Sequence, residues 1–359
     1  MTISNNQDRL FLDIYAIQTL PPSNINRDDT GSPKTTQYGG VRRARVSSQS
    51  WKKAMRDYFY EHAEEEQLGK RTRKVVNYVA EKIIHQKIDL NEKESSKLAT
   101  DILKLAGVPT DGKVLFFIGN TEAEKLATAA VKGVKDKEEA RKIMQSNLAL
   151  DVALFGRMVA NDKEIEADAS SQFAHPISTH AVQTEFDFYT AVDDLASDDD
   201  AKAGMLGTVE FNSSTLYRYA NVAIHEFLVQ RGNREDLVDS LKLFIKAFAE
   251  SMPRGKINSF ANQTIPQTLI ITVRSDRPVN LVSAFEEPVK SSNGYVTKSI
   301  EKLSKEFAKV EKMVKKPVLS FYVSLEEVEA LAKVGTEKNS ITELVEDFSQ
   351  ELSDLIQNR

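Results

Sequence analysis

The chain has 359 residues, a length that fits one large domain with insertions, or two domains. It is 41% hydrophobic and 28% charged, with only 15 Gly and 10 Pro, so it is not collagenous, low in complexity or wholly disordered. It contains no cysteine, which excludes a disulfide framework, a Cys-ligated metal and a thiol nucleophile. No apolar run nears the roughly 20 residues that cross a bilayer, and the first residues do not resemble a signal peptide, so we expect a cytoplasmic protein without a membrane partner.

Charge is distributed unevenly along the chain. The formal net charge is -5, yet the segment between Thr30 and Arg56 contains no Asp or Glu. Its basic residues, which we call the basic block, are Lys34, Arg42, Arg43, Arg45, Lys52, Lys53 and Arg56. A basic block within an acidic chain forms a local anion site, and the surrounding acidic residues limit non-specific binding. The alternative is a solvated strand and helix face.

The first predicted elements lie in and before the basic block. Residues 10–20 have the β-branched and aromatic content of a strand, which Pro21 and Pro22 are expected to end. Residues 41–46 form a second extended run. Ser47 or Ser48 can cap a helix whose apolar side chains recur at helical spacing, namely Trp51, Ala54, Met55 and Phe59. The basic block therefore spans a strand, a turn and the start of a helix.

The rest of the chain alternates helical and extended patterns. Residues 61–154 predict a mostly helical insertion, and residues 186–211 predict a projecting hairpin with a polar tip at 198–200. Later strands are expected at 217–224, 268–273 and 318–323, and later helices after a cap at Asn233, over 300–314, and after the capping boxes Ser324 with Glu327 and Ser340 with Glu343. The pattern favours an α+β fold with a sheet core, a helical insertion and a hairpin arm.

Motifs for catalysis are absent from the sequence. It contains no G-x-G-x-x-G, P-loop, H-E-x-x-H or G-x-S-x-G motif. His175 and His180 are the only close histidine pair, and their spacing does not place both on one face of an element, so we expect structural roles for them. Asp28 with Asp29, or the aspartates at 198–200, could hold a divalent ion, but the second group is better explained as a solvated hairpin tip. We predict no catalytic residue, no metal and no cofactor.

Several residues carry chemistry suited to nucleic acid. Ser47, Ser48 and Gln49 lie where a helix begins, and unpaired backbone N–H groups there attract phosphate. Lys52 and Arg56 are spaced i, i+4 and would extend from one helix face toward the same backbone.

Aromatic and apolar side chains add a second type of contact. Phe188 and Tyr189, followed by Thr190, lie at the start of the predicted hairpin and could stack on unpaired bases, or could pack the sheet. Met158 is unbranched and could wedge between bases, although most methionines fill core gaps.

These motifs carry a resemblance to a known family. Residues 26–29 (NRDD) and 39–56 (GGVRRARVSSQSWKKAMR) resemble the backbone subunit of the type I-E Cascade complex, the CasC family of CRISPR-associated proteins. The similarity continues, in the same order, at 156–158 (GRM), 174–180 (AHPISTH), 187–195 (DFYTAVDDL) and 217–221 (YRYAN), and spans roughly residues 10 to 290. The later C-terminal helices carry no such motif.

The resemblance implies a fold like a right hand. It would comprise an RRM-like (ferredoxin-like) palm, helical fingers inserted into it and a β-hairpin thumb. In this chain, residues 1–60 would begin the palm, 61–155 form the fingers, 156–184 return to the palm, 185–212 form the thumb, and 213–359 complete the palm with the C-terminal helices.

The resemblance also implies a non-catalytic role. Copies of the protein would polymerise along a CRISPR guide RNA, kink it at intervals and present it to target DNA, with other Cascade subunits as further partners. The contacts to the guide backbone map onto Arg27, Ser47, Gln49, Lys52 and Arg56, beside the basic Arg42, Arg43 and Arg45. The kink-forming residues map onto Met158 and the run of Phe188, Tyr189 and Thr190. Phe188 stands where the family often has a larger indole, which would stack over a smaller area.

The fingers of this family carry lysines that touch target DNA. The candidate DNA-facing residues here are Lys132, Lys135, Lys137, Arg141 and Lys142, interspersed with Glu138 and Glu139.

Two other functions stay open at the level of sequence. Asp28 and Asp29 lie where related backbone proteins of type III complexes place an acidic residue that cuts RNA, which suggests a metal-dependent endoribonuclease. Against this, Arg27 is adjacent, and Asp28 is suited to orienting Arg27 or capping the turn. The second alternative is a generic RRM-like protein for single-stranded RNA.

Overall fold

A computed structural model describes residues 9–159, 162–191 and 205–357. Its central sheet is mostly antiparallel, with the strand order β12-β11-β10-β1-β9-β6 and with β7 and β8 also paired to β9. The strands are β1 (Phe11–Ser23), β6 (Ser171–Phe173), β7 (Ile177–Ser178), β8 (Glu185–Ala191), β9 (Met205–Ala223), β10 (Pro266–Arg274), β11 (Leu319–Ser324) and β12 (Thr336–Glu337). The α+β class is confirmed, as are the strands expected at 268–273 and 318–323.

The first strand does not end at Pro21. β1 runs on to Ser23, and its pairing with β9 shifts register between Leu20 and Ser23. Pro21 and Pro22 lie at this irregularity, where the ladder is interrupted and a missing backbone N–H costs little. The expectation that the prolines stop the strand is wrong for this reason.

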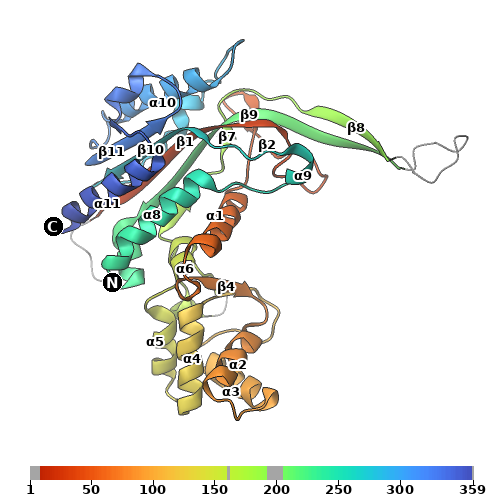
Figure 1. Cartoon of the computed structure of the whole chain (residues 1–359), viewed down its shortest axis with the longest axis vertical. Coiled ribbons are helices and arrows are strands. Elements are labelled where there is room, and N and C mark those ends of the chain that lie inside the picture. Colours follow the sequence, from red (N-terminus) through yellow and green to blue (C-terminus); the bar gives the residue numbers. More distant parts are fainter. Residues whose placement is uncertain (1–8, 160–161, 192–204, 358–359) are drawn as a thin grey trace, which may run out of the picture.

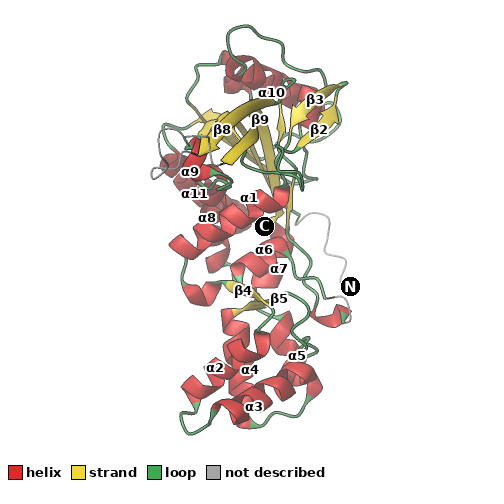
Figure 2. Ribbon diagram, turned by 90° about the vertical axis from the view of Figure 1, so that its right-hand side faces the viewer, coloured by secondary structure: helices red, strands yellow, loops and turns green. Residues whose placement is uncertain are grey.

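Helices cover both faces of the sheet (Figure 2). Alternate residues of β1 point to opposite sides, so Leu12 and Ile14 join one core and Tyr15 and Ile17 join another. The first core is closed by α1 (Ser48–His62), α6 (Leu150–Phe155), α7 (Ile224–Arg231), α8 (Glu235–Glu250) and α11 (Ile341–Gln357). The second is closed by α10 (Val296–Val310) with the short helices η3 (Val282–Phe285) and η4 (Glu329–Lys333).

The helical insertion has a hydrophobic core of its own. Figure 1 shows it projecting from the sheet as a separate lobe. Its helices are α2 (Val75–Gln86), α3 (Glu92–Leu105), α4 (Asn120–Lys132) and α5 (Lys137–Gln145), and a small ladder of β4 (Gly69–Thr72) and β5 (Phe116–Gly119) lies toward the sheet, near η1 (Glu65–Gln67) and η2 (Lys163–Ile165). The predicted helical insertion is thus confirmed, with one short β ladder added.

The hairpin arm is an extension of the sheet. β8 pairs with the first part of β9, from Glu185 opposite Phe211 to Ala191 opposite Met205. β9 is one strand of 19 residues that continues into the sheet, so residues 217–224 do not form a separate strand as expected. The predicted tip at 198–200 lies outside the described residues. Because one strand belongs to both parts, the arm is rooted in the sheet (Figure 1).

Three shorter elements complete the fold, two of them within the basic block. β2 (Thr35–Tyr38) pairs with β3 (Val41–Ala44), and α9 (Ile257–Phe260) follows α8. Among the described residues, no helix is long and apolar enough to cross a membrane.

Helix starts near the C-terminus follow the prediction only in part. The N-cap of α8 is Arg234 and not Asn233. Ser324 exchanges hydrogen bonds with the backbone of Glu326 and closes a turn, so no α-helix follows it. Ser340 does cap α11, because its Oγ accepts from the Glu343 N–H at 3.1 Å, but the Glu343 carboxylate accepts from the Asn339 N–H at 2.9 Å.

Candidate nucleic-acid interface

A cleft of about 610 Å³ lies between α1 and the segment that returns from the helical insertion. Four of the residues predicted to bind RNA line it, namely Gln49, Lys52, Arg56 and Met158. Further lining comes from Lys53, Arg71 and Phe155, and from residues 166–169. The fold therefore brings together the basic helix and the predicted apolar wedge, which are about a hundred positions apart in the sequence.

The N-terminus of α1 opens toward anions. Ser47 is the N-cap, and its Oγ accepts from the Gln49 N–H at 3.3 Å. The Ser47 N–H donates to Asn26 Oδ1 at 2.8 Å, which ties this turn to the preceding loop. The first turn of α1 contains no acidic residue, so no carboxylate there opposes the positive end of the helix dipole.

Lys52 contributes its charge from a partly apolar setting. Its ammonium lies 5.6 Å from the ring centroid of Phe155 and 5.3 Å from that of Phe173. Burial, and then the nearby Arg71, lower the pKa of Lys52. Because these rings crowd one side of the ammonium, a phosphate arriving in the cleft would regain contacts that the amine has lost with water.

Arg71 is a cleft cation that the sequence reasoning missed. It comes from β4, its guanidinium lies 4.9 Å from the Phe117 ring centroid, and the residue is exposed. Burial and the neighbouring Arg56 lower its pKa. The only signal in the sequence is a run of basic residues at 70–74, which nothing local connects to α1.

Arg56 is less available than its i, i+4 spacing suggested. Its Nε lies 3.1 Å from Asp151 Oδ2, and Asp151 is buried. Its Nη2 also donates to Tyr60 and to the Gly69 carbonyl. Both side chains line the cleft as expected, but a buried carboxylate already pairs with the Arg56 charge, which leaves Lys52 the freer cation.

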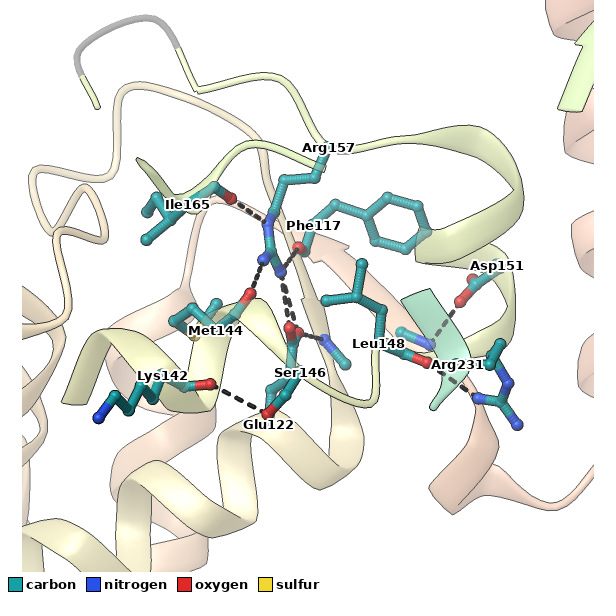
Figure 3. A network of polar contacts seen from close by, with 12 residues as sticks. Phe117, Glu122, Lys142, Met144, Ser146, Leu148, Asp151, Arg157, Ile165 and Arg231 are labelled. Atoms are coloured by element: carbon teal, nitrogen blue, oxygen red, sulfur yellow. Dashed lines mark hydrogen bonds and ion pairs between the residues drawn. The ribbon is translucent and has the colours of Figure 1, made fainter. Parts of the chain in front are cut away.

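Met158 lies between two buried residues, and Figure 3 shows the contacts of the first of them, Arg157. The preceding Arg157 is buried, and its guanidinium donates to both carboxylate oxygens of Glu122 at 3.0 Å and to the carbonyls of Ile165 and Met144 at 3.0 and 2.6 Å. The following Val159 is buried, whereas Met158 itself is 86% exposed. A core-filling role for Met158 is therefore excluded.

Gly156 allows this chain path. Its φ is +79°, and a Cβ there would lie 3.0 Å from the Ala167 carbonyl oxygen. A side chain at this position would strain the backbone and crowd the segment at 166–169 that lines the cleft.

The arginines of the basic block have different roles. Arg43 is fully buried and donates to the carbonyls of Tyr38, Ser178 and Phe285 at 3.1, 3.0 and 2.8 Å. Its prediction as an RNA contact is wrong, because these carbonyls occupy its guanidinium and leave no surface.

The remaining arginines of this region stay at the surface. Arg27 and Arg42 are exposed, and Arg45 is half-buried. The Arg45 guanidinium contacts His175 Nδ1 at 2.9 Å, and burial, with Arg45 and Lys34 nearby, lowers the pKa of His175. His180 stacks on Tyr295, and its ring contacts backbone groups. Both histidines therefore make contacts within the protein, as expected for structural roles.

The arm presents its side chains on two faces. Phe188 is 65% exposed, and strand alternation puts it on the same face as Thr190 and Phe186, which is 67% exposed. Tyr189 lies on the other face, where its ring covers Gly207 on the paired strand. The predicted arm residues Phe188, Tyr189 and Thr190 thus do not share one surface. Phe186, which the sequence analysis did not select, lies on the same face as Phe188. The arm extends away from the cleft of its own chain (Figure 1).

The predicted DNA-facing residues lie around α4 and α5. Lys132, Lys135, Lys137 and Lys142 are exposed. Arg141 pairs with Asp162 at 2.5 Å and with Glu164, so its assignment to DNA is corrected to an internal contact of the insertion.

Asp28 is engaged by its own turn. Its Oδ1 accepts from the Thr30 N–H and the Ser32 N–H at 3.0 Å and from the Thr30 hydroxyl at 2.7 Å. These hydrogen bonds, that from the Thr30 hydroxyl first, lower the pKa of Asp28. Within the described part of the chain, no three His, Asp or Glu side chains gather as candidate metal ligands.

Comparison with known proteins shows the family of the chain. A chain of a CRISPR RNA-guided surveillance complex, pre-nicking, is 30% identical with a TM-score of 0.83, over 95% of this chain and 99% of that chain. A chain of another CRISPR RNA-guided surveillance complex is 28% identical with a TM-score of 0.65, over the same shares of 95% and 99%. No curated protein matches. The family model described as CT1975-like protein matches residues 12–347, and the chain therefore belongs to the CT1975-like protein family.

Proposed function

We propose that this protein binds a CRISPR guide RNA as a subunit of an RNA-guided surveillance complex. The observation that carries the proposal is the cleft, where Gln49, Lys52 and Arg71 face the exposed Met158. The solved chains that it resembles over nearly their whole length are parts of such complexes, which supports the assignment.

The chemistry of the cleft suits a single strand with bent backbone. The N-terminus of α1 and the cations bind phosphates and fix the position of the strand without reading bases. Met158 inserts between bases and parts a stack, and sequence recognition is left to pairing between guide and target.

The finer proposal is that the protein forms the backbone of a type I-E Cascade complex in the cytoplasm. Its sheet layer would be an RRM-like palm, with residues 61–155 as fingers and 185–212 as thumb. Several copies would polymerise along one guide, each thumb bringing Phe188 and Thr190 to the RNA held by the next copy. The exposed lysines of the fingers would face target DNA. The protein itself would perform no catalysis.

RNA extraction and sequencing from the protein purified with its native partners tests this proposal. We expect discrete RNAs with CRISPR repeat and spacer sequence, together with other Cascade subunits. The comparison is with a variant that carries both Lys52→Met and Met158→Ala. This variant should co-purify with less of the partner subunits and lose most of the RNA. Heterogeneous cellular RNA in the unmodified protein would favour a generic single-strand binder instead.

The same preparation tests for nuclease activity. We expect no divalent-dependent cleavage of guide or target RNA, and no difference between the protein and its Asp28→Ala variant. Cleavage that the substitution removes would contradict the non-catalytic role.

A further inference from the structure

A second, much smaller cavity is lined by Val46, whereas Gln49 lines the cleft, so Ser47 lies between the two sites along the chain. The volume of this cavity is about 20 Å³, and it is enclosed by the end of β1, the loop at 25–34, β3 and the middle of β9. The residues that matter here are Asn26, Lys34, Arg45, Asn212 and Ser214. The Ser47 N–H bond to Asn26 Oδ1 links this cavity to the start of α1.

The cavity is lined by polar groups that have no partner. Asn212 and Ser214 are 6% and 5% exposed, yet Asn212 Nδ2 and Ser214 Oγ make no hydrogen bond. Buried donors are almost always satisfied, so each unpaired group costs folding free energy unless something binds it. An amide N–H and a hydroxyl can both donate to one oxygen atom.

The charges around the cavity are positive. Lys34 and Arg45 both line it, and in the described part of the chain neither has a carboxylate within ion-pair distance. Backbone bonds from Lys34 N to Asn26 O at 2.9 Å and from Arg45 N to Lys34 O at 2.9 Å fix the rim. The site therefore combines buried donors with two cations that have no carboxylate partner, which suits an oxygen that carries negative charge.

We propose that this cavity receives one phosphate oxygen of the bound RNA strand, held by Asn212 and Ser214 with Lys34 and Arg45 at the rim. The inference rests on the proposed function, since it extends the phosphate path from the cleft past Ser47. A volume of about 20 Å³ has room for about one water-sized group, so the rest of the phosphate would lie at the mouth between the two cations. A water molecule is the competing occupant.

Ser214→Ala is the first test, because it removes one donor and little volume. We expect affinity for guide RNA to fall about ten- to a hundredfold, as for loss of one hydrogen bond to a charged group, while the melting temperature of the free protein does not fall. Thr272→Val is the matched control, since Thr272 Oγ1 is another buried hydroxyl without a partner but belongs to β10, away from the cavity. Equal RNA affinity for Ser214→Ala and the unmodified protein would mean that water fills the cavity, and would overturn the proposal.

A scan of guide RNAs with single methylphosphonate linkages identifies the atom. One linkage should weaken binding to the unmodified protein and have clearly less effect on Ser214→Ala, because the neutralised oxygen and the missing hydroxyl act on the same contact. The proposal would be overturned if every linkage weakened binding equally in the unmodified protein and in Ser214→Ala. It would also be overturned if a single 2′-deoxy substitution, and not a methylphosphonate, had the smaller effect on Ser214→Ala, because the contact would then be to a ribose hydroxyl. If the unmodified protein binds no guide RNA, the proposed function itself fails. That outcome is distinct from failure of the phosphate contact, in which the protein binds guide RNA but Ser214→Ala has no effect.

Discussion

At the scale of single residues, identical side chains in this protein have opposite roles. Arg43 and Arg157 are buried and bind backbone carbonyls, whereas Arg42 and Arg71 are exposed. Guanidinium suits both roles because its five donors can satisfy several carbonyls at once or meet a phosphate. Exposure, which the neighbours of each residue decide, separates a structural arginine from a binding one.

The first prediction concerns Met158. Replacing it by Ala removes the apolar wedge but no buried contact, so stability should be unchanged. The measurement is the fluorescence of 2-aminopurine placed at successive positions of the guide. Unstacked bases should fluoresce strongly with the unmodified protein, and this fluorescence should fall with Met158→Ala. Met313→Ala, at a residue that is 87% exposed in the turn after α10, is the control. Undiminished fluorescence in Met158→Ala would refute the wedge.

The second prediction concerns the buried pair of Arg157 and Glu122. Arg157→Met leaves the Glu122 carboxylate buried and unpaired, so the free energy of unfolding should fall by about 3–5 kcal/mol. Urea unfolding measures this loss. Adding Glu122→Leu should restore part of it, and Arg254→Met, which breaks the exposed pair with Glu61, should cost less than about 1 kcal/mol. No recovery in the double variant would contradict the unpaired-charge explanation.

At the scale of elements, α1 joins the sheet to the cleft. Trp51, Met55 and Phe59 bury one face of α1, and Ser47 fixes where the helix begins. That burial leaves Gln49 and Lys52 facing the cleft. The helix is thus positioned by its apolar side and binds through its polar one.

The third prediction tests α1 through salt. Lys52→Met should reduce the slope of log affinity against log salt by about 0.7, the value for one phosphate contact to a single strand. Lys305→Met, at an exposed residue of α10, should leave the slope unchanged. An unchanged slope for Lys52→Met would place this lysine outside the RNA path.

At the scale of the whole molecule, the proposed function assigns binding and assembly to separate parts. The cleft lies between the sheet and the insertion, and the arm extends elsewhere with two exposed phenylalanines (Figure 1). Phe186 and Phe188 stay about two-thirds exposed, so nothing in the described part of the chain covers the Phe188 face. An arm of this kind suits contact with a neighbouring copy and its RNA.

The fourth prediction follows from this division. Phe188→Ser should leave binding of one copy to a short guide fragment within about twofold, because Phe188 is remote from its own cleft. On a full-length guide, cooperative loading of several copies should be lost, as base stacking is worth about 1–3 kcal/mol per base. Native mass spectrometry counts the copies. Val229→Ser, at another exposed apolar residue, is the control, and normal loading of Phe188→Ser would contradict the role of the arm.

Local patterns were sufficient for much of the fold. The helix after Ser47, the insertion, the strand at 268–273 and the helix after Ser340 all follow from caps and from periods of 3.6 or 2. The misses have local causes that the sequence hides: prolines at a register shift, a 19-residue strand shared by arm and sheet, and a serine that closes a turn.

By itself, the sequence determined the fold class and most of the candidate residues for contacts with nucleic acid, because charge, capping and motif order are properties of neighbours along the chain. Only the tertiary structure decided which of them are available. It buried Arg43, paired Arg56 with Asp151, exposed Met158 and brought Arg71 to Lys52. Exposure and pairing depend on contacts between segments far apart in sequence, which local patterns do not encode.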